Sequence, residues 1–144
     1  MDYKFYIRLR IFTNKLKVAK ATLSKLLIGC DTEMEYHEIA NRISRLELLE
    51  AQLLTYVMEN SNRLPWIPSS RCKAVVHWYP EERVINYGKG DLRLSELIAG
   101  DKEVEKDLRS LIEHSETPVR LKQLLLPFQQ KTSGSQSKIG SSVK

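Results

Sequence analysis

Residues 32–60 read TEMEYHEIANRISRLELLEAQLLTYVMEN, and this stretch contains the clearest structural signal in the chain. Its apolar residues recur at steps of three and four, which is the spacing of one face of an α-helix. Thr32 and Glu35 have the spacing of a capping box at the start, and Asn60 follows the apolar series at the end. The sequence therefore predicts a long amphipathic helix with an inward face made of Ile39, Ile43, Leu46, Leu49, Leu53 and Val57.

The residues before this stretch predict a second long helix. Asp2 can cap its start, Gly29 can end it, and no proline lies between them. A link as short as residues 29–32 makes the two helices adjacent and antiparallel. An alternative stays open, because residues 3–12 also alternate between apolar and less apolar positions, as in a β-strand. The helical series consists of Phe5, Leu9, Phe12, Leu16, Ala19, Leu23 and Leu26.

If the first segment is helical throughout, Ile7, Ile11 and Val18 form a further apolar strip on the face opposite the main series. A helix that is apolar on two faces needs contacts on both. We therefore predict that these three residues bind a partner, which is either another protein or a second copy of the chain.

The character of the chain changes after residue 63. The sequence LPWIP at residues 64–68 cannot continue a helix, since each proline lacks an amide donor and fixes φ. Residues 73–79 and 83–87 are rich in strand-forming types, and Pro80 lies in the first corner of a turn between them. We expect a β-hairpin over residues 72–88 that packs on the helices through Val76, Trp78 and Val84.

Short helices are expected after the hairpin. Asp91 and Asp101 can cap two of them, which Gly100 would separate. Thr117 can cap a third, with a proline at its first helical position, and this helix would end at Pro127.

Together these elements predict one domain of the α+β class, predominantly helical, over residues 1–128. It would contain a long antiparallel helix pair (2–60), the hairpin (72–88) and two or three short helices (91–126). With 144 residues, of which 42% are apolar, the chain can form one modest core. Residues 129–144 are rich in serine, lysine, glutamine and glycine, so we expect them to form a disordered basic tail.

Composition also bears on the location of the protein. The longest stretches without a charged residue have eight residues, far fewer than the ~20 that a transmembrane helix needs. Seven lysines and arginines among the first 29 residues leave no apolar core for a secretory signal. Two cysteines are too few for a disulfide framework. We therefore expect a cytoplasmic protein without a transmembrane segment.

The sequence contains no motif that identifies an enzyme. Neither a Cys-x-x-Cys nor a His-x-x-x-His pair is present to bind a metal, and no Gly-x-Ser-x-Gly elbow is present. We expect a non-enzymatic protein with no catalytic residues, no metal and no cofactor. One alternative stays open: an active site without a recognisable motif around His77, Tyr79 and Glu81.

Charge gives the remaining indication of function. The net charge is +5, but it is unevenly distributed: residues 1–29 have a net charge of +6, residues 30–59 of −5 and residues 117–144 of +5. Cations interleaved with aromatic residues are typical of nucleic-acid-binding surfaces. We therefore predict a small nucleic-acid-binding or accessory factor that contacts DNA or RNA through Lys4, Arg8, Arg10, Lys15, Lys17, Arg71 and Lys73.

The charge pattern also has three alternative interpretations. The basic and acidic segments can neutralise each other within the fold, and an amphipathic basic helix also suits an anionic membrane surface. An acid-poor amphipathic N-terminal segment is also typical of an organelle transit peptide, although this one is rich in lysine and poor in serine. The main alternative function is a protein-interaction or assembly subunit, an oligomerising helical scaffold without a nucleic-acid role.

Overall fold

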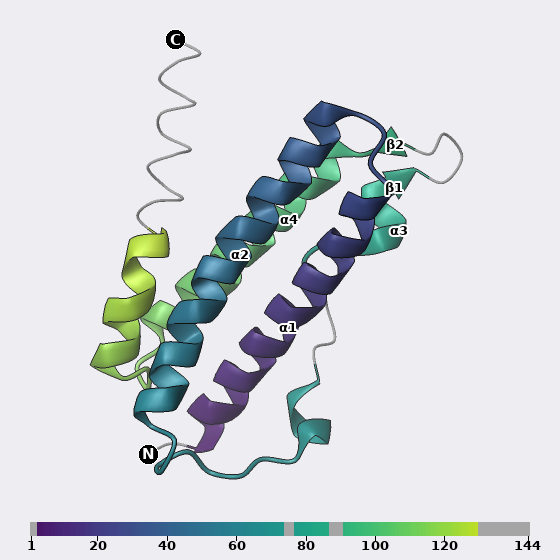
Figure 1. Ribbon diagram of the computed structural model, residues 1–144. Helices are drawn as coiled ribbons and strands as arrows, with labels where there is room; N and C mark the ends of the chain where they lie inside the picture. The colour runs from purple at the N-terminus through teal and green to yellow at the C-terminus, as the bar shows by residue number, and fades with distance from the viewer. Residues whose placement is uncertain (1–2, 74–76, 87–90, 130–144) are drawn as a thin grey trace.

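The computed structural model describes residues 3–73, 77–86 and 91–129, and its three long helices lie side by side (Figure 1). These are α1 (Tyr3–Ile28), α2 (Glu33–Glu59) and α4 (Leu94–Glu113). Shorter helical elements are the 3-10 helix η1 (Ser69–Cys72), the single turn α3 (Glu81–Val84) and a helix over residues 119–129. The strands β1 (Ile85–Asn86) and β2 (Asp91–Leu92) have two residues each and pair antiparallel.

The helix pair predicted from the sequence is confirmed. α1 is one continuous helix, so the alternative of a strand over residues 3–12 is wrong. All seven residues of its apolar series are buried, and α1 runs antiparallel to α2 (Figure 1). Thr32 is confirmed as the N-cap, because its hydroxyl accepts a hydrogen bond of 3.1 Å from the amide of Glu35. The Glu35 carboxylate accepts hydrogen bonds from the Thr32 hydroxyl and from the amide of Leu92.

The expected β-hairpin over residues 72–88 is wrong, and with it the α+β class: the protein is predominantly helical. At the position of the expected turn, the carbonyl of Pro80 accepts hydrogen bonds from the amides of Arg83 and Val84, which form the turn of helix α3. Trp78 and Val84 are buried as expected, whereas Val76 lies outside the described residues. Strand-forming residue types favour half-buried surfaces, and here Trp78 and Val84 are buried outside the two-residue strands β1 and β2.

The two short helices expected on either side of Gly100 are one helix, α4. Asp91 lies in β2 and does not cap it, because the N-cap position belongs to Arg93. Gly100 is buried in the helix interior, where an added Cβ atom would overlap the ring of Tyr79 and lie 2.6 Å from the carbonyl oxygen of Trp78. The glycine therefore permits a close approach of another segment and does not end the helix.

The last helix also differs from the prediction at both ends. It includes Pro127 and continues to residue 129. Thr117 does not cap it; its hydroxyl donates a hydrogen bond of 2.5 Å to the carbonyl of Leu111 at the end of α4. The helix is joined to α2 by an ion pair between Arg120 and Glu59, with nitrogen–oxygen distances of 2.9 and 3.0 Å.

No helix in the described part of the chain is long and apolar enough to cross a membrane, in agreement with the sequence. Of the predicted basic tail, residues 129–144, residue 129 ends the last helix, and residues 130–144 lie outside the described residues.

Candidate binding grooves

A groove between α1 and α4, here called the α1/α4 groove, brings together residues that the sequence assigned to two different functions. Its volume is about 330 Å³. From α1 come Ile7 and Ile11, predicted to bind a partner, and the predicted nucleic-acid contacts Lys4, Arg8 and Lys15. The full lining is Lys4, Ile7, Arg8, Ile11, Phe12 and Lys15 from α1, with Asp107, Ser110 and Leu111 from α4.

Asp107 of α4 lines this groove and makes two side-chain hydrogen bonds. Its carboxylate accepts hydrogen bonds from Lys15 Nζ at 2.9 Å and from the indole N–H of Trp78 at 2.8 Å. The Trp78 ring packs edge-to-face on Phe12, with ring centroids 5.2 Å apart. These contacts connect α4 to α1 and to the segment that contains Trp78.

The charge at the groove edge is positive. Lys15 is largely neutralised by Asp107, and only 19% of its side chain is exposed. Lys4 and Arg8, one turn apart, are exposed at the edge, while Ile7 and Ile11 are half-buried beside them. The groove thus combines an apolar strip with an adjacent pair of cations.

The other predicted cations do not converge on this groove. Arg10 and Lys17 lie on the opposite flank of α1, where Arg10 donates a hydrogen bond of 3.2 Å to the carbonyl of Ile67. Arg71 and Lys73 are exposed in and after η1, which is attached to α1 by a 2.7 Å hydrogen bond from Asn14 to the carbonyl of Cys72. The predicted nucleic-acid contacts are therefore distributed over several faces.

The predicted apolar strip is divided in a similar way. Val18 is half-buried but is not part of the α1/α4 groove, so only Ile7 and Ile11 of the three predicted partner-binding residues meet there.

Several cations of α1 form ion pairs within the fold. Lys20 pairs with Glu50 on α2 at 2.7 Å, and Lys25 pairs with Glu81 on α3 at 3.0 Å.

A second and larger groove, the α1/α2 groove, has a volume of about 640 Å³ and lies on the other flank of α1. The segment 64–67 closes one side of it. Its lining is mainly apolar and includes Leu9, Leu53, Leu54, Val57, Leu64, Pro65 and Ile67, with Arg10, Lys17, Glu47 and Glu50 among its charged residues.

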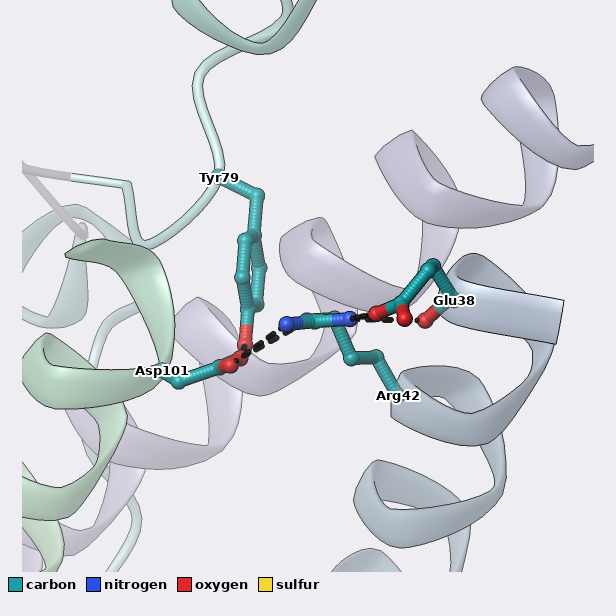
Figure 2. A network of polar contacts seen from close by, with 4 residues as sticks. All are labelled: Glu38, Arg42, Tyr79 and Asp101. Atoms are coloured by element: carbon teal, nitrogen blue, oxygen red, sulfur yellow. Dashed lines mark hydrogen bonds and ion pairs between the residues drawn. The ribbon is translucent and has the colours of Figure 1, made fainter. Parts of the chain in front are cut away.

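A polar network joins α2, α4 and the segment before α3 (Figure 2). The guanidinium of Arg42 lies between Glu38 and Asp101, and the buried Tyr79 hydroxyl donates a hydrogen bond of 2.5 Å to Asp101. Burial and the nearby Asp101 carboxylate raise the pKa of Tyr79, so this hydroxyl stays protonated. Burial alone would lower the pKa of Arg42, but hydrogen bonds to Asp101 and Glu38 raise it.

The alternative active site around His77, Tyr79 and Glu81 is not assembled as one cluster. The Tyr79 hydroxyl binds Asp101, Glu81 pairs with Lys25, and His77 is exposed. Among the described residues, no group of three or more His, Cys, Asp or Glu side chains is placed to hold a metal ion.

Comparisons of the chain with protein-family models, with curated proteins and with solved structures give no match. The α1/α4 groove therefore has to be interpreted from its own chemistry.

Several residues of these grooves were not recognised from the sequence. Asp107 and Trp78 support the α1/α4 groove across long sequence separations, which no local pattern reveals. For the α1/α2 groove, the sequence signal is the segment LPWIP at residues 64–68, which supplies the lining residues Leu64, Pro65 and Ile67.

Proposed function

We propose that the protein is a non-enzymatic protein-interaction module that binds an apolar, acidic segment of a partner in the α1/α4 groove. The observation that carries this proposal is the adjacency of Ile7 and Ile11 to the exposed cations Lys4 and Arg8. An amphipathic helix with apolar anchors one turn apart and acidic flanking residues has the complementary pattern.

The arrangement supports a protein segment as the ligand more than it supports nucleic acid. A surface that follows a phosphate backbone needs cations along one continuous path. Here Lys15 is paired with Asp107, and Arg10 and Lys17 lie on the other flank of the helix. The isoleucines would also contribute little to contacts with phosphate, whereas burial of apolar side chains stabilises a protein complex.

The proposal can be tested with two designed helical peptides of the same length. Both carry leucines at helical spacing i, i+3, i+4 and i+7; one has glutamates on the flanks and the other has lysines. Fluorescence anisotropy at low salt should show binding of the glutamate peptide, with affinity falling as salt rises, and weaker binding of the lysine peptide. Equal binding of the two peptides, or none of either, contradicts the proposal.

Variants locate the binding to the groove. Arg8→Glu should weaken binding of the glutamate peptide about tenfold, because it places a like charge beside the ligand. Lys102→Glu on the exposed side of α4 makes the same charge change away from the groove lining and should leave binding unchanged. Ile11→Glu should abolish binding, and its circular dichroism spectrum and melting curve establish that the chain still folds.

Nucleic-acid binding is a second candidate function. It is supported by one observation, the exposure of Arg71 and Lys73 beside α1, where η1 is attached. A mobility shift with mixed RNA and DNA at low salt tests it: the shift should weaken as salt rises and with the double substitution Arg71→Glu and Lys73→Glu. Absence of a shift at low salt, or a shift insensitive to salt, contradicts this candidate.

A further inference from the structure

The α1/α2 groove lies on a different flank of α1 from the proposed peptide site and presents more apolar surface. Its walls include Leu9 on α1 and Leu53 and Val57 on α2, and Ile67 closes the side formed by the segment 64–67. At about 640 Å³ it can accommodate a large side chain together with part of a backbone. Leu54 lines the groove and is itself 55% exposed, so the apolar surface extends outward to the solvent.

Trp66 belongs to the segment that forms one wall of this groove and is 83% exposed. Its chain neighbours Pro65 and Ile67 both line the groove, whereas the Trp66 side chain does not line it and extends into solvent. Prolines at positions 65 and 68 restrict the backbone, so the position of the tryptophan is largely set before any contact forms. Tryptophan is the residue type most often found among the residues that dominate binding energy at interfaces.

The charges around the groove have opposite signs on its two helices. Arg10 and Lys17 come from α1, and Glu47 and Glu50 come from α2. Glu50 is paired with Lys20, and Arg10 with the carbonyl of Ile67, whereas Lys17 and Glu47 are exposed. A purely acidic or purely basic partner would match one side and be repelled by the other.

A surface of this kind is complementary to itself. In a twofold dimer, residue i of one copy meets residue j of the other, and j meets i. The molecule offers both halves of such a contact: an apolar groove beside a segment that carries an exposed tryptophan, and a lysine on one wall of the groove with a glutamate on the other.

We propose that the occupant of the α1/α2 groove is a second copy of this chain. Trp66 of each copy inserts into the groove of the other, and Lys17 of each copy lies opposite Glu47 of the other. This dimer leaves the α1/α4 groove of both copies open, so it does not depend on the function proposed above.

Sedimentation velocity over a range of micromolar concentrations tests the dimer. The wild-type chain should change from monomer to dimer as concentration rises. Trp66→Ala should weaken dimerisation at least tenfold, a loss typical of a central tryptophan in an interface. Leu48→Ala is the matched control, because Leu48 is also exposed on α2 but does not line the groove. A wild-type chain that stays monomeric at every concentration overturns the proposal.

A charge exchange tests the geometry of the interface. Lys17→Glu gives a chain with two acids at the contact, and Glu47→Lys gives a chain with two lysines, so each variant alone should dimerise at least tenfold more weakly than wild type. Mixed together, they should form a heterodimer of near wild-type affinity, because each contact then joins opposite charges. An effect of either substitution on its own chain alone would not restore dimer affinity in the mixture, so this recovery requires positions 17 and 47 to meet across the interface. If the mixture dimerises no better than the separate variants, Lys17 and Glu47 do not face each other and the proposed interface is wrong.

Discussion

Arg42 on α2 forms a bidentate ion pair with Asp101 on α4. Its Nε atom lies 2.9 Å from one carboxylate oxygen, and a terminal guanidinium nitrogen lies 2.7 Å from the other. The pair is mostly shielded from water, since 11% of the Arg42 side chain and 19% of the Asp101 side chain are exposed. Such planar contacts fix both distance and orientation. This pair, with Tyr79 bound to the same carboxylate, sets how α4 lies against α2 (Figure 2).

Asp101→Asn should destabilise the protein by about 2–3 kcal/mol, because it leaves a mostly buried guanidinium without its main charge partner. This loss of unfolding free energy is smaller than is usual when a buried ion pair is broken, because Glu38 still binds Arg42 at 2.8 Å. Urea denaturation followed by circular dichroism measures it. Arg109→Ala breaks an exposed pair within α4 and should cost about 0.5 kcal/mol or less. Equal losses for the two variants would contradict the structural role of the Arg42–Asp101 pair.

Gly100→Ala should destabilise the protein by about 2 kcal/mol, although alanine is the better helix former by about 1 kcal/mol. The reason is steric: the new Cβ would overlap the Tyr79 ring and approach the Trp78 carbonyl to 2.6 Å. Ala99→Gly, at the adjacent exposed position, should cost about 1 kcal/mol from helix propensity alone. A higher melting temperature for Gly100→Ala would show that propensity, and not packing, decides this position.

The long helices could be predicted because the information that specifies them is local. The apolar series of α1 and the Thr32 N-cap are periodic or short-range patterns, and the structure reproduces both. The region 72–100 could not be predicted in the same way. Its structure depends on contacts between residues that are distant in sequence, such as Tyr79 and Gly100. The elements α3, β1 and β2 lie between these two residues in the chain, so no local pattern reveals their contact.

The same distinction applies to the candidate site. Periodicity predicted one apolar strip of Ile7, Ile11 and Val18 on α1, but only Ile7 and Ile11 line the α1/α4 groove. The charge pattern identified Lys15 as a cation, but its partner Asp107 is 92 positions away and could not be inferred. Counting charges by segment therefore overestimates the charge available to a ligand, since ion pairs formed in the fold are invisible to it.

Thr32→Ala should destabilise the protein by about 1 kcal/mol, the usual cost of losing an N-cap hydroxyl. The amide of Glu35 would lose the acceptor that it now has at 3.1 Å. Thr55→Ala serves as the control, because this hydroxyl donates to the carbonyl of Ala51 inside α2, where alanine is favoured. Thermal melts of the two variants should therefore differ, with a lower midpoint only for Thr32→Ala; identical midpoints would mean that the cap contributes nothing.

Alkaline pH should destabilise the protein through Tyr56 and Tyr79. Burial and the neighbouring Tyr6 raise the pKa of Tyr56, and burial and Asp101 raise that of Tyr79. Above about pH 10, where an unfolded tyrosine ionises, the unfolded chain binds fewer protons than the folded one, so stability falls as pH rises. The slope should reach about 1.4 kcal/mol per pH unit for each of the two tyrosines. Urea denaturation between pH 8 and 11, in steps of about half a unit, measures this slope. Tyr56→Phe and Tyr79→Phe should each reduce this slope by the contribution of one tyrosine. If the slope is unchanged in both variants, other groups cause the loss of stability at alkaline pH.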